Sequence, residues 1–342
     1  MSQVDQLWDR ANAYKVSVAL FALSETGVLR ALAEAPKSAA ELAEGCGLIT
    51  DALEPLLELM VTSGVLERAA LAYALPRAQA RVLPFVELEA QLCAARIHPR
   101  ALVGALRGQP LGDPMDLERS APLWPVFLRA MAVGAASLAP HLARAVRAVP
   151  GTQLVDLGGA DGSLALALSR MLPELRVTIV DRQAVATAFA ERCREAGALE
   201  GFAFLAADLR CPSTWVSTLD SADVIIAANV LHLLTPDQRR GLLAAVLQHG
   251  KPGSQLVVYE QFVSRERADA ASCLVVDWLL CGTPFGETEV EFGAALEQAG
   301  FRGVAHRRAP GLPGALVVAV LPERVGASRS ARVDSPAAGV LP

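Results

Sequence analysis

A glycine-rich turn follows an apolar segment near the middle of the chain. In VDLGGADGS, Asp156 lies within the apolar segment, and Gly158, Gly159 and Gly162 lie in the turn. Glycines let a backbone turn tightly and approach a ligand closely, and a helix that follows begins with free N–H groups. The spacing differs from the G-x-G-x-x-G of dinucleotide sites, and an acid precedes it. A ligand with an ammonium group suits this turn better than a pyrophosphate.

Two more acids end the next two apolar segments. Asp181 closes RVTIVD, and Asp208 closes FAFLAAD. A single aspartate after a strand is more often a helix cap or a turn residue. Here two successive strand ends carry one, after a glycine turn, so we favour a nucleoside ligand. An acid at the second strand end can accept both ribose hydroxyls, and one at the third can meet an adenine amino group.

Strands and helices alternate from Pro150 onwards. The predicted strands are 153–158, 176–181, 202–208, a segment at 222–234 that runs on into a helix, 255–262 and 314–321. Strands separated by helices specify a parallel, doubly wound α/β sheet, whose ligands bind beyond the carboxyl ends of the strands. We predict a Rossmann-like catalytic domain at 150–322 and a disordered tail at 323–342.

The preceding residues are predicted to be mainly helical. Apolar residues recur at helical spacing over 14–35 with a break at Gly27, and Ser38 and Glu41 spell a capping box. A helix over Thr50–Gly64 and a small hairpin complete a winged-helix order. The module lacks basic recognition residues, so we interpret it as a dimerisation domain rather than a DNA reader. The predicted bounds are 1–100 for this domain and 101–149 for a helical linker that borders a substrate pocket.

Composition excludes several classes of protein. The chain has 342 residues, 53% of them hydrophobic, and a formal net charge of -5. No Lys/Arg stripe stands out, so we expect no nucleic-acid partner. The six cysteines include no C-x-x-C pair, which argues against a metal site or a disulfide framework and for a cytoplasmic protein. We find neither a secretion signal nor about 18 uninterrupted apolar residues, and therefore expect no membrane partner.

From about residue 6 to 321 the sequence resembles the plant-type and bacterial natural-product O-methyltransferases, such as the caffeate and acetylserotonin enzymes. The resemblance is carried by YKVSVALFALSETGVLRALAEAPKSAAELAEGCGL and by VDLGGADGS. It implies S-adenosyl-L-methionine (SAM) as cofactor, S-adenosyl-L-homocysteine (SAH) as product, a small-molecule acceptor and a homodimer. In that family the acid after the second strand binds ribose, here Asp181, and the acid after the third faces adenine, here Asp208. We add Leu209 and Asn229 to the cofactor site.

The family's catalytic histidine lies in a segment L-H-D-W-x-D. The matching segment here, Leu231-His232-Leu233-Leu234, keeps the histidine and loses the Asp-Trp pair. Two glutamates flank that histidine in the family. The first corresponds to Glu260 and the second, loosely, to Glu287, with Glu289 as a replacement. The resemblance implies that His232 takes the proton of a phenol or an enol while Glu260 or Glu287 fixes its ring. The alternative is a helix-terminal histidine with local hydrogen bonds only.

The predicted acceptor pocket is largely apolar. Asp277 matches an acid on the family's pocket helix, and Trp124, Phe127 and Met131 share one helix face, although such a stripe more often belongs to an ordinary core. We expect a hydrophobic secondary metabolite with a hydroxyl group as acceptor. The six predicted pocket residues are Trp124, Phe127, Met131, Asp277, Trp278 and Cys281.

Two alternatives stay open. The first keeps the fold and SAM but not the methyl transfer, as in relatives that act as hydroxylases, decarboxylases or pericyclases, and the altered segment after His232 allows it. The second is a regulator whose winged helix binds DNA. The absence of a basic patch and the presence of Asp156, Asp181 and Asp208 count against that regulator.

Overall fold

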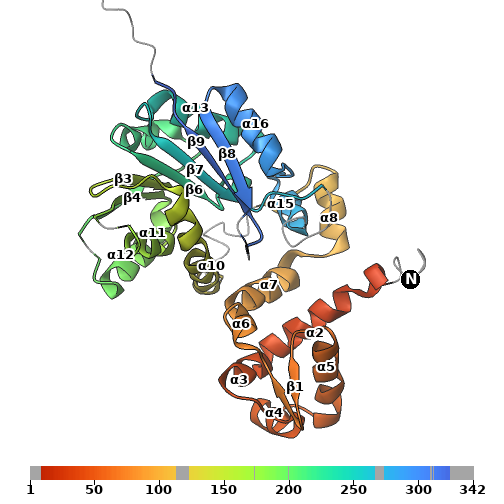
Figure 1. The fold of residues 1–342 in the computed structure, drawn as a ribbon. Helices are drawn as coiled ribbons and strands as arrows, with labels where there is room; N and C mark the ends of the chain where they lie inside the picture. The colour runs from red at the N-terminus through yellow and green to blue at the C-terminus, as the bar shows by residue number, and fades with distance from the viewer. Residues whose placement is uncertain are drawn as a thin grey trace, which may run out of the picture.

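The computed structural model describes residues 9–112, 123–172, 174–198, 200–265, 273–308, 310 and 312–323. The chain folds into an N-terminal helical domain and a larger sheet domain, joined by a helical region (Figure 1). The predicted tail at 323–342 lies outside the described residues except for Glu323.

The N-terminal domain is a small helical module with one hairpin. Gly27, with a φ of 85°, separates the helix that ends at Glu25 from the helix that begins at Val28. The Ser38–Glu41 capping box opens the next helix, and both features were predicted. Leu23, Leu42 and Leu57 form its core with their apolar neighbours. Its elements are α2 (Tyr14–Glu25), α3 (Val28–Glu34), α4 (Ala39–Cys46), α5 (Thr50–Thr62), β1 (Glu67–Ala69), β2 (Ala72–Ala74) and α6 (Arg77–Ala80).

Three helices lead from this module to the sheet: α7 (Leu83–Arg96), α8 (Pro99–Leu106) and α10 (Trp124–Ala145). Helix α7 packs against α2 on one side and α10 on the other, so it joins the two domains. By length and composition α10 could cross a membrane, and α2 with α3 forms a bent pair that passes the same test. Helix α10 packs on α7 and on α11 (Ser163–Ser169).

The larger domain is built on a seven-stranded sheet with the order β5-β4-β3-β6-β7-β9-β8. The pairings among β5, β4, β3, β6 and β7 are all parallel, whereas β9 pairs antiparallel with both β7 and β8. This confirms the predicted doubly wound sheet. The strands are β3 (Gln153–Leu157), β4 (Arg176–Asp181), β5 (Phe202–Ala206), β6 (Val224–Ala228), β7 (Gln255–Glu260), β8 (Arg302–Arg308) and β9 (Ala315–Val320).

One strand of this sheet was not predicted. Strand β8 was missed because its residues, RGVAHRR, are mostly exposed at the sheet edge and form no apolar run. The predicted segment 222–234 consists of β6, which ends at Ala228, and a 3-10 helical turn, η4 (Leu231–Leu233). His232 therefore lies on a turn beyond the strand end.

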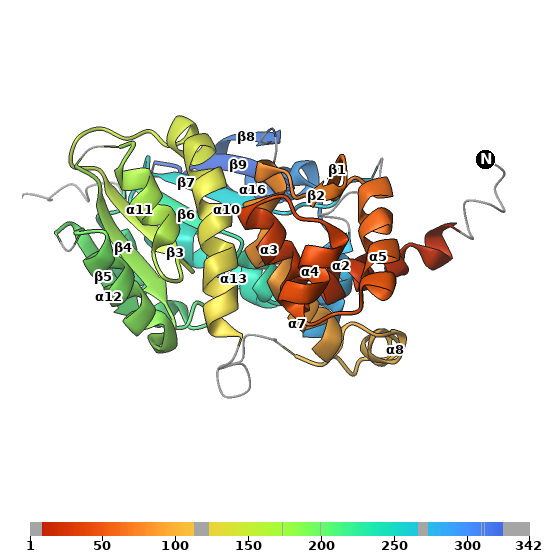
Figure 2. The same ribbon diagram turned by 90° about the horizontal axis from the view of Figure 1, so that it is seen from below.

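Helices cover both faces of the sheet (Figure 2). Side chains of α10, α11 and α12 (Ala186–Glu195) pack with Leu154 and Ile179 on one face, while α13 (Pro236–His249) and α16 (Glu289–Ala299) pack with Val155 and Val180 on the other. This alternation along β3 and β4 is the period of two expected of strands buried on both faces.

The order of the strands reverses between β3 and β6. These strands are neighbours, although β4 and β5 separate them in sequence, so the chain winds in opposite directions on either side. In such sheets the ligand crevice opens beyond the carboxyl ends of the strands at this point. The glycine turn follows β3, and the segment with His232 follows β6, so both lie at this crevice.

Candidate active site

The glycine turn after β3 lies directly against the segment that follows β6. Gly158 has φ 79°, and a Cβ atom there would lie 2.5 Å from Cγ2 of Val230. Ala160 is also left-handed, with φ 48°, and its N–H donates to Oδ2 of Asp181 at 2.8 Å. Asp181, at the end of β4, therefore stabilises the glycine turn, and it also lies at the edge of the sheet where the cofactor is predicted to bind.

A second acid in the turn fastens it to two helices. Asp161 accepts hydrogen bonds from the N–H of Ser163 at 3.0 Å and from Nε and Nη2 of Arg192 at 3.1 and 3.0 Å. It thus satisfies the first turn of α11 and ties that turn to α12. The sequence analysis gave Asp161 and Arg192 no role, although an acid two residues before a serine at a helix start was a signal for this cap.

Two buried acceptor atoms at this edge lack a donor among the described residues. One is Oδ2 of Asp156, whose residue is 2% exposed, and the other is Oδ1 of Asn229. Burial, together with the charge of Asp181, raises the pKa of Asp156 to about 7. Asn229 has φ 51°, and its N–H donates to the carbonyl of Tyr259. A ligand that brings ammonium or hydroxyl donors would satisfy both atoms, so these residues fit a nucleoside with an amino-acid head.

Asp208 lies just beyond β5 and is already paired. Nε and Nη2 of Arg210 donate to its two carboxylate oxygens at 2.9 and 2.5 Å, and this bonding holds the pKa of Asp208 below its usual value. Leu209 beside it is buried. Asp208, the acid predicted to face adenine, is therefore held in place by Arg210, for which no role was predicted.

His232 and Glu260 form a buried pair. Nδ1 of His232 lies 2.8 Å from Oε2 of Glu260, and Oε1 of Glu260 accepts the N–H groups of Val230 and Leu231 at 2.8 and 2.6 Å. Glu260 ends β7 and is 0% exposed. The carboxylate is acceptor-only when ionised, so Nδ1 carries the hydrogen and Nε2 has a free lone pair. This arrangement allows the ring to accept a proton at Nε2.

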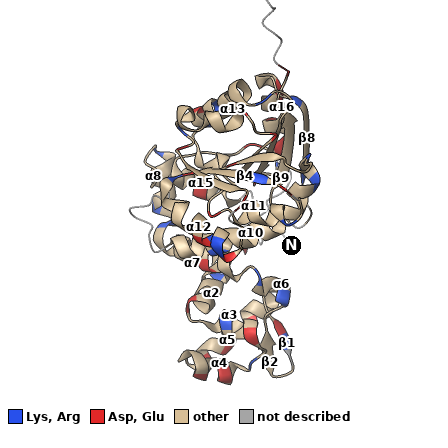
Figure 3. Ribbon diagram, turned by 90° about the vertical axis from the view of Figure 1, so that its left-hand side faces the viewer, with Lys and Arg blue, Asp and Glu red and all other residues tan. Residues whose placement is uncertain are grey.

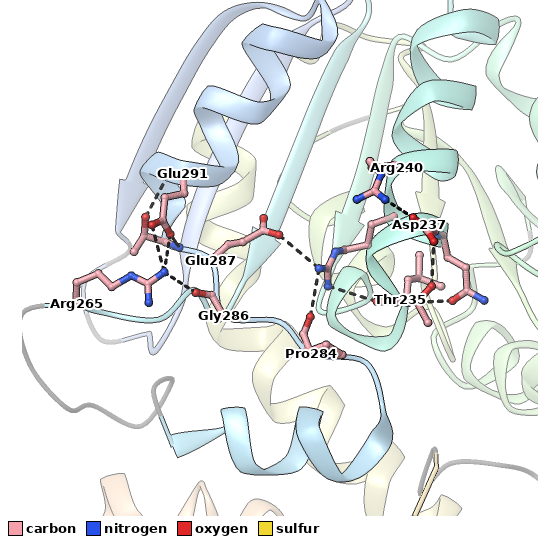
Figure 4. A network of polar contacts seen from close by, with 12 residues as sticks. Thr235, Asp237, Arg240, Arg265, Pro284, Gly286, Glu287 and Glu291 are labelled. Carbon is pink, nitrogen blue, oxygen red and sulfur yellow. Dashed lines mark hydrogen bonds and ion pairs between the residues drawn. The ribbon is translucent and has the colours of Figure 1, made fainter. Parts of the chain in front are cut away.

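Of the two glutamates left open by the sequence, Glu260 is the one brought to His232. Oε1 of Glu287 lies instead 3.4 Å from Nη2 of Arg239, on the loop that Figure 4 shows facing α13. Glu289 pairs with Arg308, whose Nε lies 2.8 Å from its Oε1. Glu287 and Glu289 thus have arginine partners, and Glu260 is the glutamate that contacts His232.

Aromatic rings form the wall beside His232. Trp278, on α15 (Val275–Cys281), has its ring centroid 5.8 Å from that of His232, and Phe285 meets Trp278 edge-on at 5.2 Å. Trp124 touches Phe127 edge-on at 5.5 Å, and Phe127 and Met131 pack with Leu88 and its neighbours between α7 and α10. Phe127 and Met131 thus take part in the packing between these two helices, whereas Trp278 lies beside His232.

Acids from both domains approach each other next to this wall. Glu89 on α7 is half-buried, and its burial, together with the charge of Asp277 on α15, raises its pKa to about 7. Burial likewise raises the pKa of Asp277, against the nearby charge of Arg96. Nη2 of Arg96 lies 3.9 Å from Sγ of Cys281. Glu89 could not be predicted as a site residue, because no sequence pattern around a helix residue shows that it faces another domain.

Fold and site together define a class of protein. A doubly wound sheet with a glycine turn, acids after successive strands and a histidine–carboxylate pair at its switch point is typical of enzymes that bind a nucleoside cofactor. An O-methyltransferase domain model matches residues 118–302, and an O-methyltransferase dimerisation domain model matches residues 8–80. The chain therefore belongs to the O-methyltransferase family. It is a SAM-dependent O-methyltransferase, with SAH as the product of its cofactor.

Individual relatives cover most of the chain. The mitomycin biosynthesis 6-O-methyltransferase of Streptomyces lavendulae is 31% identical over 301 residues, covering 81% of this chain and 83% of that protein. The tetracenomycin polyketide synthesis 8-O-methyl transferase of Streptomyces glaucescens is 29% identical, covering 85% and 89%. The crystal structure of human N-acetylserotonin methyltransferase in complex with SAM superposes with a TM-score of 0.76 at 22% identity, covering 94% and 99%. This last likeness shows the fold.

The burial of Asp156 predicts a pH-dependent stability. An aspartate titrates near 3.9 when unfolded but at about 7 here, so its ionised form opposes folding as pH rises above about 4, and fully above about 7. We expect ligand-free Asp156→Asn to unfold at a higher temperature than the wild type at about pH 8, with the gain shrinking toward about pH 5. Thermal unfolding at both pH values measures this. Asp220→Asn, at an exposed aspartate, is the control; an equal Asp156→Asn gain at both values would contradict the assignment.

Proposed function

We propose that the protein methylates a phenol or enol hydroxyl of a hydrophobic natural product, with His232 as general base. The observation that carries this proposal is the buried His232–Glu260 pair beside the cofactor turn. Two relatives named for mitomycin and tetracenomycin synthesis support an acceptor of the natural-product class. The predicted pocket residues Trp278, Asp277 and Cys281, together with the α10 stripe, would line the acceptor side.

The chain's own residues position and deprotonate the acceptor. SAM, when bound, supplies an activated methyl group, so the acceptor oxygen needs chiefly correct placement and loss of its proton. Nε2 of His232 would take that proton, because Glu260 holds Nδ1 as the donor. The same carboxylate would then stabilise the imidazolium, and the ring of Trp278 lies beside the imidazole.

Residues at four strand ends, those of β3, β4, β5 and β6, would hold the cofactor. Asp156 and Asn229 offer acceptor atoms without donors, Asp181 would bind the ribose hydroxyls, and Asp208 with Leu209 would face the adenine. The close approach of Gly158 to Val230 leaves no space for a side chain in the turn. Gly159 is equally constrained, since a Cβ there would lie 2.7 Å from Oδ2 of Asp156, and Gly162 abuts Phe189.

Replacing Asp181 tests the ribose assignment. We expect Asp181→Ala to weaken SAH binding by about 1–3 kcal/mol, because the charged acceptor of hydrogen bonds from both the ligand and the turn is lost. Titration calorimetry with SAH measures the change, and Asp220→Ala serves as an exposed-acid control. Wild-type affinity in Asp181→Ala would refute the assignment.

Replacing His232 tests the general base. We expect His232→Ala to keep SAH affinity and to lose about 10²–10⁴-fold in methylation rate, the usual contribution of a general base. The acceptors are a panel of hydroxylated aromatic compounds, with the gain of one methyl group followed by mass spectrometry between about pH 6 and 9. For an acceptor already ionised the loss should shrink, because placement alone then carries the reaction.

Equal rates for wild type and His232→Ala over the whole pH range, with an acceptor that is not ionised, would remove the base role. If SAH binds but no member of the panel is methylated, the result would favour the alternative in which SAM serves a reaction other than methyl transfer.

We further propose a homodimer formed largely through residues 6–100. The dimerisation domain match supports it, and Tyr14, Val18 and Ile49 expose apolar side chains on that module. We expect light scattering to give twice the chain mass of 36.0 kDa, and Val18→Asp to lower it toward the monomer. Val290→Asp, which alters an exposed valine on α16, should leave the dimer intact. A monomeric wild type at micromolar concentration would contradict the proposal.

The winged-helix order does not favour a DNA-binding function. In a helix-turn-helix the second helix enters the major groove, and here that helix, α5, carries Asp51, Glu54 and Glu58 without a lysine or arginine. Helix α4 adds Glu41 and Glu44. Figure 3 shows acidic segments on these helices, which would repel phosphates. The acidic residues of α4 and α5 therefore argue against a nucleic-acid partner.

A further inference from the structure

Arg239 is a buried cation that the proposed reaction does not use. It lies on the first turns of α13, its residue is 6% exposed, and burial holds the pKa of its guanidinium below the usual value. The neighbouring charges of Glu287 and Glu260 act in the opposite direction. A buried guanidinium is costly unless its donors are used, so its contacts indicate what it stabilises.

The contacts of Arg239 reach two separate segments. Nη1 donates to the carbonyl of Leu234, which directly follows the turn η4 with His232, at 3.3 Å. Nη2 donates to the carbonyl of Pro284 at 3.3 Å and lies 3.4 Å from Glu287. Figure 4 shows Pro284 and Glu287 on the loop between α15 and α16, facing α13 across a gap that these contacts bridge. The side chain thus joins the histidine turn to the loop.

The same loop carries the aromatic wall. The guanidinium of Arg239 lies over the ring of Phe285, 4.8 Å from its centroid. Phe285 meets Trp278 edge-on, and Trp278 faces His232. Arg239 therefore reaches His232 from two directions, through the backbone at Leu234 and through the rings of Phe285 and Trp278.

The loop glutamate is committed to this contact. The sequence pattern left Glu287 open as a partner of His232, but its carboxylate lies next to Arg239, and its carbonyl accepts the N–H of Val263 at 3.1 Å. On the far side of the loop, Arg265 donates to the carbonyl of Gly286 at 3.1 Å, as Figure 4 shows. With the loop held at three points, its displacement requires the loss of several hydrogen bonds together.

We propose that Arg239 is a positioning residue: its guanidinium fork sets the distance between the His232 turn and the Trp278–Phe285 wall, and so fixes the imidazole against the acceptor. The inference rests on the proposed role of His232 for its catalytic meaning, but the positioning itself is a property of the ligand-free chain. It assigns Glu287 to the anchoring of Arg239 rather than to the histidine.

The test measures the imidazole of His232 directly and needs no methyl acceptor. In the full-length protein with SAH, the Nδ1–H proton resonance of His232 is assigned by its absence in His232→Ala. We expect Arg239→Ala to shift or broaden this resonance while SAH affinity stays within about twofold, because the fork contacts the histidine turn and not the cofactor turn. Millimolar guanidinium should restore the resonance by filling the vacated site; a generally destabilised protein would not recover in a denaturant.

Two further variants sharpen the test. Arg240→Ala removes the neighbouring exposed arginine, which pairs with Asp237, and should leave the resonance unchanged. Arg239→Lys keeps the charge without the fork, so it should also shift the resonance, and it serves if Arg239→Ala does not fold. With a panel compound that the wild type methylates, kcat should fall about 10²-fold in Arg239→Ala, as for a displaced catalytic group.

The outcomes separate this inference from the proposed function. An unchanged His232 resonance in both Arg239 variants would overturn the positioning role, whatever the rates. A shifted resonance that guanidinium restores would support it, even where His232→Ala shows that the histidine is not the base.

Discussion

The buried carboxylate of Glu260 is the interaction on which the site depends. Its two oxygens accept three hydrogen bonds, from the N–H groups of Val230 and Leu231 and from Nδ1 of His232. A carboxylate without exposure is tolerated only when its lone pairs are used, so the turn after β6 must bring these donors to it. One constraint thus fixes the path of that turn and the tautomer of the histidine. Val230, held in this turn, in turn limits the space above Gly158.

The cofactor edge is arranged differently, because part of its bonding capacity is left for a ligand. Asp156 and Asn229 keep buried oxygens that accept no hydrogen bond from any described residue, at a cost to the ligand-free protein. Asp161 and Asp181, by contrast, use their carboxylates to hold the glycine turn in its strained shape. The turn is therefore prepared before the cofactor arrives, and binding energy need not be used to order it.

The proposed acceptor side draws on both domains. Helix α7 joins the dimerisation module to α10, and its Glu89 lies close enough to Asp277 on α15 for the two charges to interact. A dimer contact on α2, which packs on α7, would thereby be connected to the aromatic wall beside His232. Arg239 contacts that wall through Phe285 and the loop at Pro284, so elements far apart in the sequence meet there.

The sequence by itself determined the features that local patterns encode. These are the period-two strands, the glycine turn after β3, the acids after β4 and β5, the capping box at Ser38 and the presence of a histidine beyond β6. Each depends on neighbouring residues, whose spacing repeats the geometry of a strand, a turn or a cap.

Only the tertiary structure decided which distant charges meet. It placed Glu260 against His232 and Glu287 against Arg239, and brought Glu89 toward Asp277. It also added β8, an exposed edge strand whose pairing with β9 no apolar pattern announces. Such contacts depend on distances between packed elements, which the spacing of residues along one element does not specify.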